Sequence, residues 1–201
     1  RIMGNGIEGQ LQEVFVGIDE DGEFVEQLGP LSTPLLAERL SVEGILLGRG
    51  HIAEVNLHLE QFMVEVSAII SKGYLVIIDY GDIASSLYHY SRKNGSLRCF
   101  FQQQLTYDLF DRVGEQDITA DVNFTSLEMA AKKAGLESVG KKWQGLWLEN
   151  LGIRKFRSHH SSINLDTGLD ITKLISPASL GSTFQVLAFK TSGLPDAPGF
   201  P

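Results

Sequence analysis

Regular alternation near the start of the chain predicts a β-hairpin. Val14, Val16 and Ile18 alternate with Phe15 and Gly17, which is typical of a strand. The acidic run that ends in a glycine at residues 19–22 is a strong turn signal, and residues 23–28 can form the returning strand. We therefore place a hairpin at residues 12–28.

A second pattern, from residue 54 to residue 81, predicts one helix–strand unit of an α/β sheet. Gly73 ends the helix, and Tyr74–Ile78 is an apolar run without alternation, as expected of a strand covered on both faces in a parallel sheet. Ligands of open α/β sheets bind beyond the carboxyl ends of the strands, where Asp79 and Tyr80 would lie. The helix is predicted by apolar residues at helical spacing: Val55, Leu59, Phe62, Met63, Val66, Ile69 and Ile70.

The remaining segments are less regular. Thr125 and Glu128 form a capping-box pattern, with Thr125 as the N-cap of a helix and Glu128 reaching back to it. Residues 82–117 show no clear period, and we expect a long, ordered insertion loop there, because connections of this length are usually functional. The proline and glycine residues of 193–201 predict a flexible tail. Further helices are predicted at 35–40, 143–151 and 169–175, and a last strand at 184–189.

Composition and charge narrow the classes of partner. The 201 residues include 17 lysines and arginines against 25 aspartates and glutamates, a net charge of −8, which argues against a nucleic-acid partner and leaves a basic protein partner open. Cys99 is the single cysteine, so an internal disulfide is excluded. No apolar run approaches the roughly 20 residues that a membrane span requires. No apolar segment follows Arg1, so we expect no signal peptide.

Taken one by one, the candidate chemical groups leave alternatives open. Asp79 is equally well interpreted as a ligand-facing carboxylate and as a turn or cap residue. Asp117 and Asp121 could form an acidic cluster, but a capping Asp117 and a solvated Asp121 are favoured. Arg98 is either an anion contact or, more often for such residues, a surface charge. Adjacent histidines such as His159 and His160 point in different directions, so we expect no metal site.

Five segments, taken together and in order, resemble the MidA-type S-adenosylmethionine (SAM)-dependent methyltransferases. They are Gly73–Gly81, which contains Ile-Asp-Tyr-Gly; Gly95–Arg98, similar to Gly-Thr-Leu-Arg; Asp117–Phe124, similar to Asp-Ile-Thr-Ala-His-Val-Asp-Phe; Gln144 with Leu148 and Leu151–Ile153; and Leu180–Gly181 with Phe184–Ala188. Asp121 stands where the family has its histidine. The family's glycine-rich SAM loop has no counterpart in this chain.

The resemblance implies a fold and a function. The fold would be α/β, with part of a Rossmann-like methyltransferase sheet, an added hairpin and a substrate-recognition insertion; residues 1–192 would form the C-terminal part of the methyltransferase domain. The cofactor would be SAM, with its binding residues unknown here, and this chain alone would not bind SAM tightly and would be inactive. Family members are bacterial, which implies the cytoplasm, or mitochondrial, which implies the matrix. The mitochondrial members are protein arginine methyltransferases that assist respiratory complex I assembly.

The resemblance also implies roles for particular residues. Methylation of an arginine needs carboxylates that orient the guanidinium and hold its charge, and Asp79 and Asp117 are the expected catalytic pair. The implied partner is a protein that presents an arginine, which suits the net charge of −8. Exposed sheet edges could also make the chain a homo-oligomer. The alternative is a non-catalytic interaction or assembly-factor domain that docks a partner through residues 82–117 and the hairpin. The expected substrate-binding residues are Tyr80, Gly81, Arg98, Gln116 and Gln144.

Overall fold

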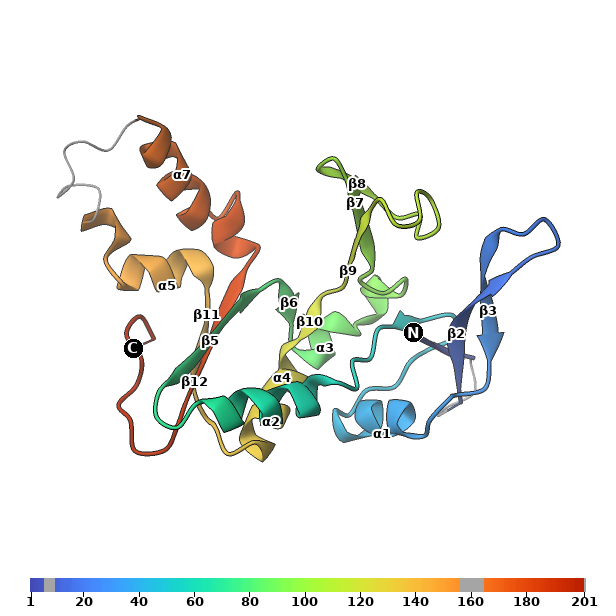
Figure 1. Ribbon diagram of the computed structural model, residues 1–201, viewed down its shortest axis with the longest axis horizontal. Helices are drawn as coiled ribbons and strands as arrows, with labels where there is room; N and C mark the ends of the chain where they lie inside the picture. Colours follow the sequence, from blue (N-terminus) through green and yellow to red (C-terminus); the bar gives the residue numbers. More distant parts are fainter. Residues whose placement is uncertain (6–9, 156–164, 201) are drawn as a thin grey trace. The chain divides into compact units, whose positions relative to one another are not determined.

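The computed structural model describes residues 1–5, 10–155 and 165–200 (Figure 1). The chain divides into two compact units, each built from two separate stretches of sequence. Unit 1 comprises Arg1–His58 and Asp82–Ser126, and unit 2 comprises Leu59–Gly81 and Leu127–Pro201. The chain therefore passes from one unit to the other three times.

A four-stranded antiparallel sheet in the order β3-β2-β1-β4 organises unit 1. The hairpin predicted at residues 12–28 is present, with Ile18 opposite Phe24 and Glu13 opposite Gly29. The carboxylate of Asp19 closes its turn by accepting hydrogen bonds of 2.9 Å from the backbone N–H groups of Asp21 and Glu23. The strands are β1 (Ile2–Gly4), β2 (Leu11–Ile18), β3 (Phe24–Gly29) and β4 (Ile52–Ala53).

The core of unit 1 lies between this sheet and two helices. Helix α1 (Leu35–Val42) contributes Leu36 and Leu40, and α3 (Ala84–Leu87) contributes Ala84 and Leu87. These side chains pack with Ile2 of β1 and Ala53 of β4, both fully buried. The outermost strand, β4, is tied to the segment after α3, because the N–H of Ile52 donates a 2.7 Å hydrogen bond to the carbonyl of Lys93.

Residues 82–117, expected to be a long loop, contain regular structure instead. Strands β7 (Arg98–Phe101), β8 (Gln104–Thr106) and β9 (Asp117–Thr119) form an antiparallel sheet in the order β8-β7-β9. Gln102 and Gln103 take positive φ angles of 47° and 66° and make the tight turn between β7 and β8. Strands of three or four residues are too short to show a period in the sequence. The other elements are η1 (Tyr90–Arg92) and the paired strands β6 (Gly81–Asp82) and β10 (Val122–Asn123).

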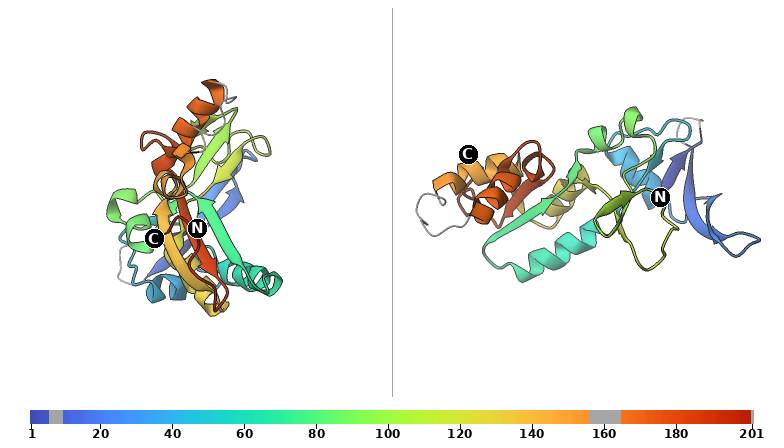
Figure 2. Two further views of the ribbon diagram at one scale, coloured as in Figure 1. Left: turned by 90° about the vertical axis from the view of Figure 1, so that its left-hand side faces the viewer. Right: turned by 90° about the horizontal axis from the view of Figure 1, so that it is seen from above.

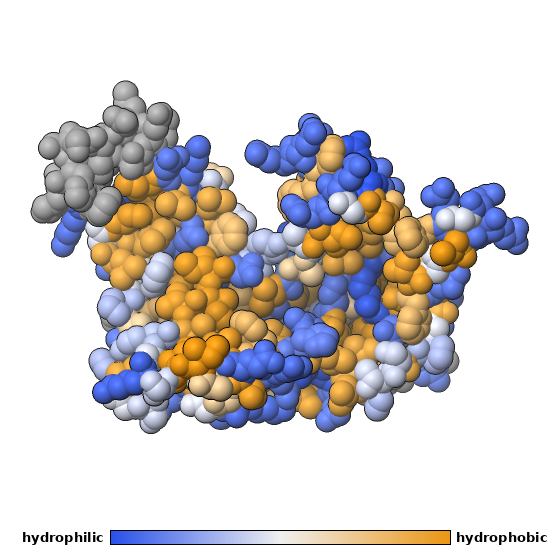
Figure 3. Space-filling model, in the orientation of Figure 1, coloured by the Kyte–Doolittle hydropathy of each residue, from blue (hydrophilic) through white to orange (hydrophobic). Residues whose placement is uncertain are grey.

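Unit 2 is built on a sheet in the order β11-β12-β5, in which both neighbours of β12 (Gln185–Lys190) are antiparallel to it. β12 is buried, whereas β5 (Tyr74–Asp79) is an edge strand with Val76 and Ile78 exposed by 42% and 46%. The expectation that this strand is covered on both faces in a parallel sheet is therefore wrong for the described residues, because β5 has one neighbour and one uncovered face. Figure 3 shows hydrophobic residues at the surface over these strands. β11 spans Glu137–Trp143.

The helices of unit 2 pack closely where glycine permits it. A Cβ on Gly145 of α5 (Gln144–Asn150) would lie 2.4 Å from the carbonyl oxygen of Ile175, which ends α7 (Leu165–Ile175). A Cβ on Gly181 of η2 (Leu180–Ser182) would lie 2.3 Å from the same oxygen. The absence of two side chains thus lets α5 and η2 approach the end of α7. α2 spans Leu59–Ile69.

The predicted cap of α4 (Phe124–Lys133) is displaced by two residues. The side chain of Asn123 accepts a 3.1 Å hydrogen bond from the N–H of Ser126, so Asn123 caps the helix. The hydroxyl of Thr125 instead accepts the backbone N–H of Ala84 at 3.0 Å. The capping box predicted for Thr125 and Glu128 is therefore wrong, because a tertiary contact takes the hydroxyl and Asn123 competes for the cap.

The end of the chain, expected to be flexible from residue 193, is held against unit 2 up to residue 200. The Tyr74 hydroxyl donates a 2.8 Å hydrogen bond to the carbonyl of Pro195, and the Asn150 side chain donates one of 3.0 Å to Gly199. The ring of Phe200 lies 6.3 Å from that of Trp147. Proline and glycine remove regular structure here but do not prevent specific contacts. In the described part of the chain, no helix combines the length and the apolar character needed to cross a membrane.

Candidate functional site

Asp79 lies at the carboxyl end of β5, where the sequence places it. Its Oδ1 accepts a 2.8 Å hydrogen bond from the N–H of Tyr80, which fixes the carboxylate at the point where the strand ends. Across the sheet Asp79 is opposite Gln185 of β12, which is in turn opposite Trp143 of β11. The side chain is partly buried, so its carboxylate can still meet a ligand.

Two buried glutamines hold the same end of the sheet. The side chain of Gln185 donates a 3.0 Å hydrogen bond to the carbonyl of Gly81 and so fixes the backbone just beyond Asp79. Gln144, the first residue of α5, donates through its side chain to the carbonyl of Leu174 at 3.0 Å and through its backbone to Phe184. Both glutamines therefore position backbone segments around the strand end.

An aromatic pair completes this end of unit 2. The ring of Tyr80 lies 5.8 Å from the ring of Phe184, at a tilt of 58°. Unit 2 therefore brings together four of the predicted site residues: Asp79, Tyr80, Gly81 and Gln144. Gln185 and Phe184 belong to the same cluster but were missed as site residues, because the sequence indicated only that they belong to the last strand.

Arg98, one of the predicted substrate contacts, takes part in an ion pair within unit 1. Asp121, whose side chain is 8% exposed, pairs through one carboxylate oxygen with Arg98 and through the other with Arg92. The expectation that Asp121 is solvated is therefore wrong. The side chains of Arg92 and Arg98 are about one-third exposed, so both arginines lie at the border between this buried carboxylate and solvent.

The Asp121 pair continues into a buried polar network. The N–H of Asp121 donates to the hydroxyl of Ser96 at 3.1 Å, and that hydroxyl donates to Oε2 of Glu54 at 3.0 Å. The N–H of Ser96 donates to the same oxygen at 2.7 Å, while Arg1 Nε lies 3.2 Å from Oε1 of Glu54. Gly95 is required beside it, because a Cβ there would lie 2.3 Å from the Glu54 carboxylate. Sequence reasoning missed Glu54, which is separated by 42 residues from Ser96.

The two remaining predicted residues are also in unit 1. Gln116 donates through its side chain to the carbonyls of Asp108 and Leu109 at 2.9 and 3.3 Å, so it holds the turn before β9. Asp117, in β9 opposite Phe100, is exposed. The two carboxylates predicted to act as a pair, Asp79 and Asp117, are thus carried by different units.

Burial shifts several other titratable groups. Burial raises the pKa of Tyr88 to about 12, and its hydroxyl donates to the carbonyl of Glu54 at 2.9 Å. Burial also raises the pKa of the Cys99 thiol, which disfavours the nucleophilic thiolate. Burial lowers the pKa of His51, an effect that Glu54 opposes.

The described residues contain neither a glycine-rich cofactor loop nor a metal centre. In residues 1–5, 10–155 and 165–200, no turn with several glycines leads from a strand into a helix, as a loop that cradles a nucleotide cofactor would. The described part of the chain also holds no group of three or more residues suited to a metal ion. His159 and His160 lie outside it.

Comparison with known proteins identifies the family. The model of a family described as "Putative S-adenosyl-L-methionine-dependent methyltransferase" matches residues 6–142. The mitochondrial protein arginine methyltransferase NDUFAF7 of Rattus norvegicus is 34% identical over 148 residues, which cover 71% of this chain and 30% of that protein.

Two solved structures from Burkholderia thailandensis share the fold. One, bound to S-adenosyl-homocysteine, superposes with a TM-score of 0.88 at 31% identity, covering 99% of this chain and 51% of that chain. The other, an uncharacterized protein, superposes with a TM-score of 0.85 at 30% identity, covering 100% of this chain and 52% of that chain. The chain thus spans about half the length of these solved relatives. The α/β class predicted from the sequence is confirmed, and the chain belongs to the MidA-type family of SAM-dependent methyltransferases.

Proposed function

We propose that the protein to which this chain belongs transfers a methyl group from SAM to an arginine side chain of a protein substrate. SAM would supply the methyl group, and the family's glycine-rich SAM loop has no counterpart among the described residues. The chain alone is then inactive. The family membership and the name of the rat relative support this function, as does the net charge of −8. The mitochondrial location of that relative supports the matrix in a eukaryote; a bacterial member would work in the cytoplasm.

The observation that carries the proposal is the carboxylate held at the end of β5. Asp79 is fixed by the N–H of Tyr80, and Gln185 and Gln144 fix the backbone around it. A carboxylate in such a position accepts hydrogen bonds from a guanidinium, which orients the acceptor nitrogen and holds the positive charge. Tyr80 and Gly81 then shape the site around Asp79, whereas the roles of Asp117 as second catalytic carboxylate and of Arg98 and Gln116 as substrate contacts rest on the family resemblance alone.

The test is a methylation assay of the full-length protein with labelled SAM and candidate acceptor proteins. Asp79→Asn keeps the shape of the side chain and removes its charge, so we expect at least about a hundredfold lower rate of arginine methylation. The matched control is Glu137→Gln. Glu137 lies in the same sheet at the opposite end, paired across it with Lys190, and its replacement should leave the rate unchanged.

The outcome separates the enzyme from a binding protein. An unchanged rate in the folded Asp79→Asn variant would overturn the role of Asp79. A full-length wild type that binds its partner but labels no arginine would instead support the non-catalytic interaction or assembly-factor domain.

A further inference from the structure

The hairpin of β2 and β3, called here the arm (residues 11–29), carries a free sheet edge. β3 is the outermost strand of its sheet in the described part of the chain. The N–H of Val14 donates to the carbonyl of Arg1, so the even-numbered residues of β2 direct their backbone groups toward β1. The odd-numbered residues of β2 therefore direct their backbone groups toward β3, where they pair with the odd-numbered residues of that strand. The backbone groups of the even-numbered residues Phe24, Glu26 and Leu28 consequently point outward from β3. This edge can therefore accept another strand.

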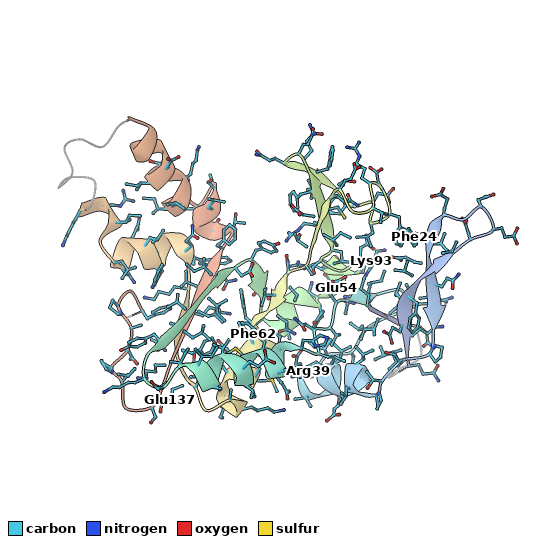
Figure 4. The ribbon with its side chains drawn as sticks, viewed as in Figure 1. Phe24, Arg39, Glu54, Phe62, Lys93 and Glu137 are labelled. Carbon is cyan, nitrogen blue, oxygen red and sulfur yellow. The ribbon has the colours of Figure 1, made fainter. Side chains whose placement is uncertain are left out.

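One face of the arm is largely apolar and exposed; the exception is Glu26, which lies opposite Val16 on this face and forms an ion pair with Arg1. Ile18 and Phe24 are opposite each other, as are Val14 and Leu28, and Val16 lies between these pairs on the same face. The exposed fractions are 64% for Val16, 63% for Ile18, 44% for Phe24 and 50% for Leu28. The ring of Phe24, labelled in Figure 4, lies 6.1 Å from the ring of Phe110 in the turn before β9 and continues the face in that direction. An exposed apolar surface of this kind marks an interaction site.

The acidic residues of the arm favour a basic partner. Residues 12–28 contain six acidic residues and no lysine, arginine or histidine. Asp19 is used in the turn and Glu13 accepts the N–H of Ser32, but Glu20, Asp21 and Glu23 are exposed at the tip. In Figure 3 the tip of the arm is hydrophilic, with hydrophobic residues along the strands beside it, and Figure 2 shows the tip extending away from the rest of unit 1. A second copy of the arm would bring like charges together, which disfavours self-pairing.

We propose that the arm docks an extended, basic segment of the methyl-acceptor protein, in which arginine or lysine alternates with apolar residues, as an added strand on the free edge of β3. Main-chain hydrogen bonds to Phe24, Glu26 and Leu28 give affinity, the apolar face takes the partner's apolar side chains, and the acidic tip takes its cations. The identity of the partner rests on the proposed function; the docking of a basic strand does not.

The test uses the full-length protein and a labelled synthetic peptide in which arginine alternates with valine, followed by fluorescence anisotropy. The peptide should bind, more weakly as salt is raised, and a peptide that alternates glutamate with valine should not. Glu20→Gln with Glu23→Gln should weaken binding about tenfold, because two exposed charges are lost. Val16→Thr with Ile18→Thr keeps the β-branched shape but removes apolar surface, and this double variant should also bind the peptide more weakly. The control is Glu38→Gln, an exposed acid of α1.

The outcomes are decisive in both directions. Equal binding of the two peptides, or unchanged binding by both arm variants, overturns the proposal. A second result would also overturn it. In that result the protein dimerises with rising concentration, Val16→Thr with Ile18→Thr abolishes the dimer, and the arginine–valine peptide does not compete with dimerisation. Asp79→Asn should abolish methylation and leave peptide binding intact. If no arginine is ever methylated but the peptide binds as described, the proposed function fails and the docking surface stands.

Discussion

Individual residues show how tertiary partners decide what a charged side chain does. Asp79 is the last residue of β5 and Asp121 directly precedes β10, yet Asp79 remains able to meet a ligand whereas Asp121 is buried between Arg92 and Arg98. Buried carboxylates of this kind tie segments together, because an unpaired charge would be costly to bury. Arg98, which the sequence marks as a substrate contact, has its position set by Asp121.

The first prediction at this scale concerns Asp121. Asp121→Asn removes the charge that faces two guanidinium groups and should lower the free energy of unfolding by about 1–3 kcal/mol, less than for a fully buried pair because both arginines are partly exposed. Chemical denaturation of the two proteins measures this difference. The control is Asp117→Asn, an exposed position where a change within about 0.5 kcal/mol is expected. Equal losses in the two variants would contradict the role of Asp121.

The second prediction at this scale concerns how the stability of the folded chain depends on pH. Burial lowers the pKa of His51 from its ordinary value of 6.5, so the folded state keeps the ring neutral while the unfolded chain takes up a proton. The stability contributed by neutral His51 is therefore present above about pH 6.5 and is lost as pH falls below it, by at most about 1.4 kcal/mol per pH unit. Thermal or denaturant unfolding from about pH 7.5 to about pH 5 should show a steeper loss in the wild type than in His51→Gln. Parallel curves would refute this.

At the scale of elements, short strands and close helix contacts carry the specific structure. β7, β8 and β9 turn a segment without sequence periodicity into an ordered sheet, and the end of the chain packs on Trp147 and Tyr74. The approach of α5 and η2 to the end of α7 depends on Gly145 and Gly181. These glycines matter because they leave space, and their backbone angles are ordinary.

Gly181→Ala tests that contact. Its Cβ would lie 2.3 Å from the carbonyl oxygen of Ile175, so backbone must move, and we expect a loss of about 1–3 kcal/mol in unfolding free energy. Gly48→Ala is the matched control, because a Cβ there meets no atom within 4 Å and its φ is not positive. That control should be neutral or stabilising by up to about 1 kcal/mol. Denaturant titration of both variants and the wild type measures the difference in unfolding free energy. Similar stability of the two variants would show that the glycine contact is dispensable.

At the scale of the whole molecule, the chain forms two units that are interleaved in sequence. The residues expected to act on one substrate are divided between them: Asp79, Tyr80, Gly81 and Gln144 in unit 2, and Arg98, Gln116 and Asp117 in unit 1. The edge strand β5 and its exposed Val76 and Ile78 form a surface typical of a sheet that continues or self-associates.

We accordingly expect the isolated 201-residue chain to self-associate through β5. Val76→Thr with Ile78→Thr keeps β-branched residues on the strand while removing apolar surface, and light scattering should report a clear fall in mean mass at the same concentration. The control pair is Val16→Thr with Ile18→Thr on the arm, which should leave self-association unchanged. A wild-type chain that remains monomeric at the same concentration would contradict this expectation.

The sequence alone determined the elements that have a strong local signal, and the family. The hairpin, a helix before Gly73, the strand that ends at Asp79 and the order of five motifs could all be recognised, because periodicity and turn chemistry are local properties. The helix was expected from Val55, whereas α2 begins at Leu59. The tertiary structure decided which hydroxyl capped α4, that Asp121 is paired, that Glu54 lies beside Ser96, and that β5 is an antiparallel edge. Each of these depends on contacts between groups far apart in the chain, and no local sequence pattern specifies which distant group a residue contacts.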